Sequence, residues 1–347
     1  ASNPDLTWER TLSTNFGLNV GFFDNKLTLE VDHYISKTQD LLLQVPVSVV
    51  SGFDTSLQNI GRVNNTGWEF LLGINNNDHD LKWNLNFNIA FNENEVKELG
   101  PEGKPIIAKG GAKNYFITQI GDAIGSYYTL KTNGIFETQE ELDSFPHHAN
   151  TRVGDIRYVD VNGDGKIDES GDRTITGSYN PDYTFGINGG LNYGDFDLGF
   201  NIQGSQGNEV FNILNRYINN VEGNFNNKVE VLNRWISPSE PGNGTVYRAN
   251  RVAAGSNGTS SDWHIEDGSY IRLQNVSLGY NLPESVLESL QLDKLRVSLS
   301  GQNVFTISDY SGYNPEVSGR RTNTAPGEDY GTYPLAKTFS VGLNVSF

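Results

Sequence analysis

The chain has 347 residues, no cysteine and a formal net charge of −17. A chain without cysteine forms neither a disulfide framework nor a thiolate metal site, and a charge of this sign argues against nucleic acid or an anionic membrane surface as a partner. It contains no run of about 18 apolar residues, so the sequence predicts no transmembrane helix.

The first predicted elements are two strands that form a hairpin. In residues 12–23, apolar side chains such as Phe16 and Leu18 alternate with small or polar ones. The alternation resumes after a turn at 24–25 and continues through residues 26–43. A period of two gives a strand one apolar and one polar face. Residues 12–23 and 26–43 are therefore predicted to pair.

The same alternation recurs along the rest of the chain. It is clearest in residues 80–92, where apolar side chains alternate mostly with asparagine. Asparagine is a poor strand former and would be unusual in a sandwich core, but it suits the wall of a water-filled lumen. Further strands are predicted at 68–74, 183–193, 196–206, 268–282, 292–306 and 335–347.

The connections between these strands alternate in length. The long ones are predicted at 44–62, 97–182, 207–267 and 307–334, and the short ones at 24–25, 77–79, 194–195 and 283–291, the last with room for one or two helical turns. Short periplasmic turns and long extracellular loops are typical of outer-membrane barrels. The strands also match or exceed the ~9–11 residues that cross a bilayer when tilted. The fold class is therefore predicted to be all-β, an antiparallel transmembrane β-barrel.

The predicted strands number nine, which conflicts with a complete bacterial barrel. Such barrels have even strand numbers and begin in the periplasm, and an isolated arc of strands would leave two open edges. We therefore expect a partial barrel whose missing part lies before Ala1. The opening "ASNPDLTWERT" also reads as an internal segment of a processed or fragmentary product.

The alternation also predicts which face of the barrel each side chain occupies. One set of side chains is expected to point outward to lipid: Leu85, Phe87, Ile89, Val341 and Leu343. The neighbouring set is expected to line the lumen: Asn84, Asn86, Asn88, Gly342 and Asn344.

Several motifs, in order along the chain, resemble the SusC/RagA-type TonB-dependent transporters of Bacteroidetes. They include "NIGRVNNTGWEF", "GDIRYVDVNGDGKID", "NPDYTFGINGGLNYGDFDLGFNIQGSQGN", "IEDGSYIRLQNVSLGYNLP" and the terminal "FSVGLNVSF". The resemblance covers essentially all of residues 1–347. It implies the C-terminal part of a barrel whose N-terminal plug, TonB box and remaining strands are not in this sequence.

The resemblance further implies a function in the bacterial outer membrane. It implies TonB-dependent import of oligosaccharides or peptides by a barrel subunit that works with a SusD/RagB-like surface lipoprotein. TonB would act through the N-terminal region. No enzymatic activity and no nucleic acid partner are expected, and the sequence contains no G-x-S-x-G, Walker or H-E-x-x-H motif.

The stretch "DVNGDGKIDESGD" resembles the first half of a calcium-binding EF-hand loop. Asp160, Asn162 and Asp164 alternate before Gly165, which permits a sharp turn. The twelfth position carries Gly171 in place of the bidentate glutamate. We expect structural calcium here, with an Asx-turn without metal as the alternative. The expected ligands are Asp160, Asn162, Asp164, the Lys166 carbonyl, Asp168, directly or through water, and Asp172, which would replace the missing glutamate.

Aromatic residues in the long loops are the candidate substrate contacts. They could stack on sugar rings or line a peptide path, and the alternative for each is a role in loop architecture. The candidates are Trp235, Trp263, Tyr310 and Tyr313. The five histidines show no metal-ligand spacing, and His147 and His148 are interpreted as a solvated pair.

Two other functions remain open from the sequence. A passive outer-membrane porin would share the strand pattern but would lack the plug and the TonB box. A soluble calcium-braced carbohydrate-binding β module would share the loop motif but would leave the membrane fraction without detergent.

Overall fold

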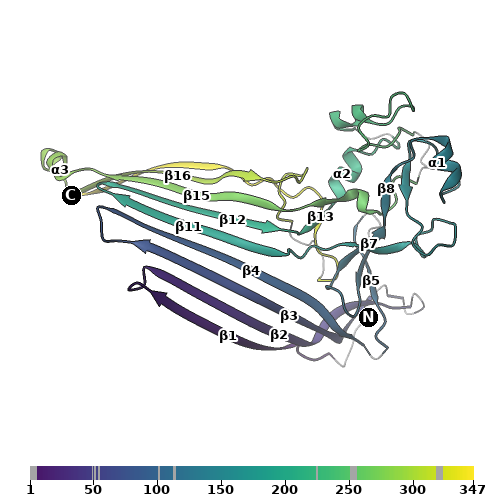
Figure 1. The fold of residues 1–347 in the computed structure, drawn as a ribbon, viewed down its shortest axis with the longest axis horizontal. Helices are drawn as coiled ribbons and strands as arrows, with labels where there is room; N and C mark the ends of the chain where they lie inside the picture. The colour runs from purple at the N-terminus through teal and green to yellow at the C-terminus, as the bar shows by residue number, and fades with distance from the viewer. Residues whose placement is uncertain are drawn as a thin grey trace.

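The computed structural model describes residues 6–48, 50, 52–53, 55–100, 102–111, 115–223, 226–250, 256–317 and 323–347. Within this part of the chain the dominant feature is a nine-stranded sheet in the order β1-β2-β3-β4-β11-β12-β15-β16-β18, in which every neighbouring pair is antiparallel. Figure 1 shows these strands as a curved wall with the short turns at one end and the long connections at the other. The strands are β1 (Arg10–Phe22), β2 (Leu27–Pro46), β3 (Thr55–Asn76), β4 (Leu81–Leu99), β11 (Tyr183–Tyr193), β12 (Phe196–Gln206), β15 (Tyr270–Asn281), β16 (Lys294–Ile307) and β18 (Thr338–Ser346).

All nine predicted strands are present, and the predicted pairing of residues 12–23 with residues 26–43 is confirmed. The largest difference is β3, which begins at Thr55, whereas the alternation begins at Trp68. The extra residues pair with the end of β2 across two irregularities near Leu41, where the period of two is broken. Strict alternation therefore underestimates strand length toward the long connections.

The register confirms that the two predicted sets of side chains lie on opposite faces of the wall. That one face meets lipid and the other lines a lumen stays a prediction. Asn84, Asn86 and Asn88 lie opposite Gly190, Asn188 and Gly186 on β11. The intervening Leu85, Phe87 and Ile89 lie opposite Gly189, Ile187 and Phe185. On β18, Val341 lies opposite Leu299 and Gly342 opposite Ser298. Directly opposed residues of antiparallel strands share a face, so one face of the wall is apolar and the other is polar.

The two faces differ in what packs against them. On the apolar face Val341 is 78% exposed, and Phe339 and Leu343 beside it are also exposed. On the polar face, near the long connections, Ile124 donates its backbone N–H to Asn94 Oδ1 (2.9 Å). There Val96 is buried against Ile106. In the described part of the chain, the loops therefore cover the polar face at this end and leave the apolar face bare.

The long connections fold into a region at one end of the wall (Figure 1). It contains a four-stranded sheet in the order β10-β7-β6-β5, a three-stranded sheet in the order β14-β13-β17 and the pair β8-β9, counted over the described residues. Their strands are β5 (Ile106–Lys109), β6 (Tyr115–Thr118), β7 (Ser126–Leu130), β8 (Thr132–Ile135), β9 (Ile156–Tyr158), β10 (Arg173–Gly177), β13 (Glu209–Asn212), β14 (Ile265–Asp267) and β17 (Glu328–Asp329).

Short helices complete the fold. α1 (Gln139–Ser144), α2 (Ile213–Ile218) and the 3₁₀ turns η3 (Val229–Asn233) and η4 (Asp262–His264) lie in the loop region. α3 (Glu284–Leu290) lies at the opposite end and confirms the helical turns predicted in 283–291 (Figure 1). In the described part of the chain, no helix is both long enough and apolar enough to cross a membrane. Much of the buried core is in the loop region, where Phe116, Tyr127 and Phe211 are fully buried.

β1 and β18 are the two edges of the wall, and within the described residues they do not pair with each other. A small closed barrel, which would have contradicted the prediction of a partial one, is therefore not what these strands form. The prediction that further strands complete the wall stays a prediction.

Candidate functional site

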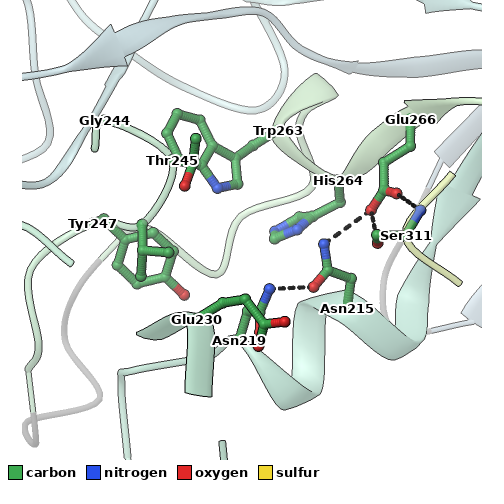
Figure 2. Close-up of a pocket in the computed structure, with 11 residues that line it drawn as sticks. Asn215, Asn219, Glu230, Gly244, Thr245, Tyr247, Trp263, His264, Glu266 and Ser311 are labelled. Atoms are coloured by element: carbon green, nitrogen blue, oxygen red, sulfur yellow. Dashed lines mark hydrogen bonds between the residues drawn. The ribbon is translucent and has the colours of Figure 1, made fainter. Parts of the chain in front are cut away.

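The candidate site is a cavity of about 500 Å³ in the loop region. This volume lies within the range of roughly 300–1,000 Å³ that is usual for ligand pockets. Figure 2 shows its side chains converging from α2, from η4 with β14, and from the segment that holds Thr245 and Tyr247. The lining comes from segments 215–219, 230, 244–247, 263–266 and 311, so nearly a hundred residues of chain separate its two ends.

α2 supplies the amide side of the cavity. The helix begins after Asn212, whose Oδ1 accepts the backbone N–H of Asn215 (2.7 Å) and so caps the first turn. Asn215 and Asn219 are four residues apart and therefore lie on one face of the helix. The Asn219 amide donates to Asn215 Oδ1, which links the two side chains along the cavity wall (Figure 2).

Glu266 on β14 fixes the position of this amide pair. Its Oε1 accepts from Asn215 Nδ2 (2.9 Å), Asn212 Nδ2 (3.0 Å) and Ser311 Oγ (2.9 Å). Its Oε2 accepts the backbone N–H of Ser311 (2.9 Å). With four donors on its two oxygens, the carboxylate ties α2, β13, β14 and the segment at Ser311 together. It therefore acts as a support for the cavity wall.

His264 at the end of η4 is the buried polar group of the cavity. Its side chain is 4% exposed, and its Nε2 has no hydrogen-bond partner in the described part of the protein. Burial, with a smaller contribution from the positive charge of Arg216, lowers the pKa of His264 to about 3. The imidazole is therefore neutral at physiological pH, and its Nε2 is enclosed by protein atoms rather than open to the cavity.

Two aromatic rings form the opposite wall. Tyr247 and Trp263 lie with their ring centroids 6.5 Å apart and their planes inclined by 58°. Tyr247 belongs to a buried apolar cluster with Leu130, Ile156 and Trp235, against which Trp263 packs. This cluster buries the Tyr247 ring almost completely (3% exposed), so the partly exposed Trp263 is the more accessible of the two rings.

The four aromatic residues predicted as substrate contacts occupy different environments. Trp263 lines the cavity. Trp235 is 8% exposed and lies over the backbone of Gly154, where an added Cβ would come within 2.3 Å of its ring. Tyr310 is 7% exposed and donates its hydroxyl to Asp329 Oδ2 (2.5 Å). Tyr313 is 68% exposed and lies away from the cavity lining.

Of the four predicted residues, only Trp263 lies at the cavity. Trp235 and Tyr310 pack the interior of the loop region and have little surface to offer a ligand, as the alternative interpretation of each expected. Contact of Trp263 or Tyr313 with substrate stays a prediction. His264 and the α2 amides leave no local spacing signal in the sequence, because they come together only through burial and convergence of distant segments.

The predicted calcium loop lies between β9 and β10, and its aspartates accept backbone N–H groups. Asp160 accepts from Gly163 (2.7 Å) and Gly165 (2.8 Å), and Gly165 has the positive φ of +81° that the turn requires. Asp172 is fully buried and accepts from Val161 (2.9 Å) and Asp168 (2.8 Å). These N–H donors offset part of the repulsion among the closely spaced aspartates, which a bound cation would also offset.

The six predicted ligands therefore have a second explanation as an Asx-turn scaffold. Asp164 accepts the backbone N–H of Lys166 (2.9 Å), and Asp168 accepts that of Gly171 (2.7 Å). Across the described residues, no three side chains of His, Asp or Glu are grouped as a metal site. Calcium at this loop stays a prediction.

The known proteins that the chain resembles are TonB-dependent receptors. Residues 1–304 match the family described as TonB dependent receptor-like, beta-barrel. The chain is 37% identical to TonB-dependent receptor P3 of Formosa agariphila, over all of this chain and 35% of that protein. It is 31% identical to TonB-dependent receptor SusC of Bacteroides thetaiotaomicron, over all of this chain and 33% of that protein.

The solved structures that resemble this chain include those of a transporter, RagAB. The structure of the RagAB peptide transporter superposes on the whole chain with a TM-score of 0.81 and 25% sequence identity, and this chain covers 36% of that one. The open-open state of the RagAB peptide importer gives a TM-score of 0.79 at 25% identity. The chain spans about a third of the length of the curated relatives it matches.

Proposed function

The chain belongs to the TonB-dependent receptor β-barrel family of outer-membrane proteins, and from this membership we propose that it forms part of the wall of a nutrient importer. The importer takes up oligosaccharides or peptides across the outer membrane under TonB drive. The protein contributes no covalent chemistry in this proposal. It provides a walled path and a loop region that contacts solute outside the cell.

The observation that carries the proposal is the two-faced wall. An exposed apolar face on nine adjacent strands would be an aggregation surface in water, whereas in a bilayer the same face is solvated by lipid. The polar face carries asparagine side chains on adjacent strands, as at Asn86 and Asn188. Amide groups donate and accept hydrogen bonds without carrying charge, which suits a path for a hydrated solute.

The loop region supports an importer with a partner at the extracellular side. The relatives include RagAB, which is described as a peptide transporter. We propose a SusD/RagB-like surface lipoprotein as the partner of this chain, with TonB acting through the plug of the complete barrel. The rest of the same barrel pairs with the edges β1 and β18 in this proposal, which would satisfy the open backbone groups of both strands.

A transport experiment tests this function. Uptake of labelled oligosaccharides and peptides is measured in cells that express the full-length protein, with and without TonB and with the proton gradient collapsed. The proposal predicts uptake that requires the protein, TonB and the gradient together. Uptake that persists without TonB would instead support the passive porin.

A further inference from the structure

The apolar face of the wall carries a band of aromatic rings that crosses four neighbouring strands. Trp68 on β3 stacks on His33 of β2, with ring centroids 4.3 Å apart, and lies nearly parallel to Phe70 (6.2 Å). Phe91 on β4 contacts Phe70 edge to face (6.4 Å) and the ring of Tyr183 at the start of β11 (5.7 Å). In outer-membrane barrels, girdles of aromatic residues lie at the level of the lipid headgroups. The band therefore marks the expected headgroup level toward the long connections.

A cavity of about 450 Å³ adjoins this band. It is lined by residues 66–68 of β3, by residues 91–93 of β4 and by residues 180–182, which precede β11. The pairing of β4 with β11 ends at Ala90 opposite Thr184, although β4 continues to Leu99. The cavity therefore lies where the chain at 180–182 has parted from β4.

The aromatic part of the lining is open to a ligand. Trp68 is 46% exposed and Phe91 is 39% exposed, and the two residues lie directly opposite each other on neighbouring strands. Exposed ring faces attract cations through the charge distribution of the ring, and tryptophan does so most strongly.

The charged part of the lining is negative. Glu93 and Asp182 are both exposed, and neither forms an ion pair or a side-chain hydrogen bond with any residue that the structure describes. The described lining contains no lysine or arginine. Glu95, two residues from Glu93 on the same face, differs because it pairs with Lys97. The cavity thus joins two carboxylates without a counter-charge to two exposed rings, a combination that favours a cation.

We propose that this cavity binds the ammonium group of a zwitterionic lipid headgroup, such as that of phosphatidylethanolamine. The rings of Trp68 and Phe91 and the carboxylates of Glu93 and Asp182 would surround the ammonium group. A lipid is favoured over a soluble amine because the apolar face continues from the band toward the short turns, where acyl chains would lie along it. The site rests on the proposed contact of this face with lipid and adds a selected class of lipid. An anionic lipid without an ammonium group meets repulsion there.

Lipid retention by the full-length protein tests the site. The protein is reconstituted in vesicles of phosphatidylethanolamine, N-acetyl-phosphatidylethanolamine and phosphatidylglycerol in equal amounts, extracted in mild detergent, and its retained lipids are quantified by mass spectrometry. The N-acetyl lipid keeps the headgroup but lacks its positive charge. Glu93→Gln removes one carboxylate, and Trp68→Leu removes a ring while keeping an apolar side chain. Glu95→Gln is the matched control, on the same strand and face but already paired with Lys97.

The wild type is expected to retain phosphatidylethanolamine at least fivefold over each of the other two lipids. This preference should fall below twofold in Glu93→Gln and in Trp68→Leu and stay unchanged in Glu95→Gln. The migration of unheated samples in gels reports whether each barrel is folded. No preference in the wild type, or a preference that persists in both variants, would overturn the proposal.

A soluble competitor separates a lipid site from a site for free amines. Phosphoethanolamine in large excess should leave the retained lipid in place, and its displacement of the lipid would show that the cavity takes soluble amines instead. TonB-dependent uptake is measured for the same variants. If uptake persists while the lipid preference is absent, the headgroup site is wrong and the import function stands.

Discussion

The burial of His264 makes the stability of the loop region depend on pH. Burial disfavours the charged imidazole and lowers the pKa of His264 from its ordinary value of 6.5 to about 3 in the folded protein. Between these values the unfolded loop binds a proton that the folded loop does not. The stability of the loop region is therefore complete above pH 6.5 and decreases as the pH falls toward 3.

The slope of this loss is at most about 1.4 kcal/mol per pH unit for one proton. We expect hydrogen exchange at β13 and β14 to accelerate as the pH is lowered through this window, after correction for intrinsic rates. His264→Phe should reduce the acceleration. His147→Gln is the control, because His147 is exposed, and it should leave the acceleration unchanged. An equal acid response in His264→Phe would show that other groups control the loop.

The aspartates of the loop between β9 and β10 allow the calcium proposal to be tested one residue at a time. Asp164→Asn keeps an oxygen for the backbone N–H of Lys166 but removes one negative charge. If calcium binds, calorimetry on the full-length protein should show binding that this variant weakens at least tenfold. Asp143→Asn, on α1, is the control.

Without calcium, protease cleavage of this loop should be the same in the wild type and in Asp164→Asn, because the hydrogen bond to the backbone is retained. Absence of calcium binding in the wild type would leave the Asx-turn scaffold as the complete explanation of the motif.

At the scale of elements, Arg272 attaches a loop segment to the wall. This side chain on β15 is 3% exposed and donates from Nη2 to Asn314 Oδ1 (3.2 Å), while Nη1 donates to Glu316 Oε2. Tyr270 donates its hydroxyl to Glu316 Oε1 (2.7 Å) from the same strand. The segment around Glu316 is thus held against the polar face by one guanidinium and one phenol.

Arg272→Met should release this segment. The loss of donors to Asn314 and Glu316 should cost about 1–3 kcal/mol, toward the lower value because water reaches Glu316. Hydrogen exchange of residues 308–317 reports the release. Arg296→Met is the matched control, since Arg296 and Asp197 form a partly exposed pair whose loss should cost no more than about 1 kcal/mol. Equal effects of the two variants would contradict the attachment.

The register of β18 gives a second prediction at this scale. Val341→Arg should destabilise the folded protein by about 2–4 kcal/mol if Val341 lies near the bilayer midplane, because it places a charge on the lipid face. Ser340→Arg, one residue earlier on the polar face, should change stability by much less. Gly342 is a poorer control, since a Cβ there would come within 2.6 Å of Ser298 Oγ. Folding into vesicles under urea titration measures both variants, and equal losses would reject the assignment of faces.

These elements show what sequence patterns can and cannot predict. The alternation in residues 80–92 and 335–347 identified the strands and the two faces of each, because a period of two follows the pleat of a sheet. The extension of β3 to Thr55 was missed, because its side chains pack under loops that follow no periodic rule. The cavity was missed for a related reason, since Asn219, Thr245 and His264 converge only through the tertiary fold of the long connections.

In the molecule as a whole, the strands and the loop region have different functions. The strands provide a lipid-compatible barrier whose polar side follows from alternation alone. The loop region buries its own core and carries the cavity, so it can vary in sequence without altering the barrier. A division of this kind allows one barrel architecture to serve many substrates through its loops.

We expect the apolar face of this wall to meet lipid and the polar face to meet water, and a cysteine scan of β18 distinguishes the two. The chain has no cysteine of its own, so each thiol introduced at residues 338–346 is unique within it. Each variant of the full-length protein is labelled with an environment-sensitive fluorophore in lipid vesicles and quenched separately from the bilayer and from water. We expect bilayer quenching at Phe339, Val341, Leu343 and Val345, and aqueous quenching at Ser340, Gly342 and Asn344. Uniform aqueous quenching along β18, or the opposite alternation, would contradict it.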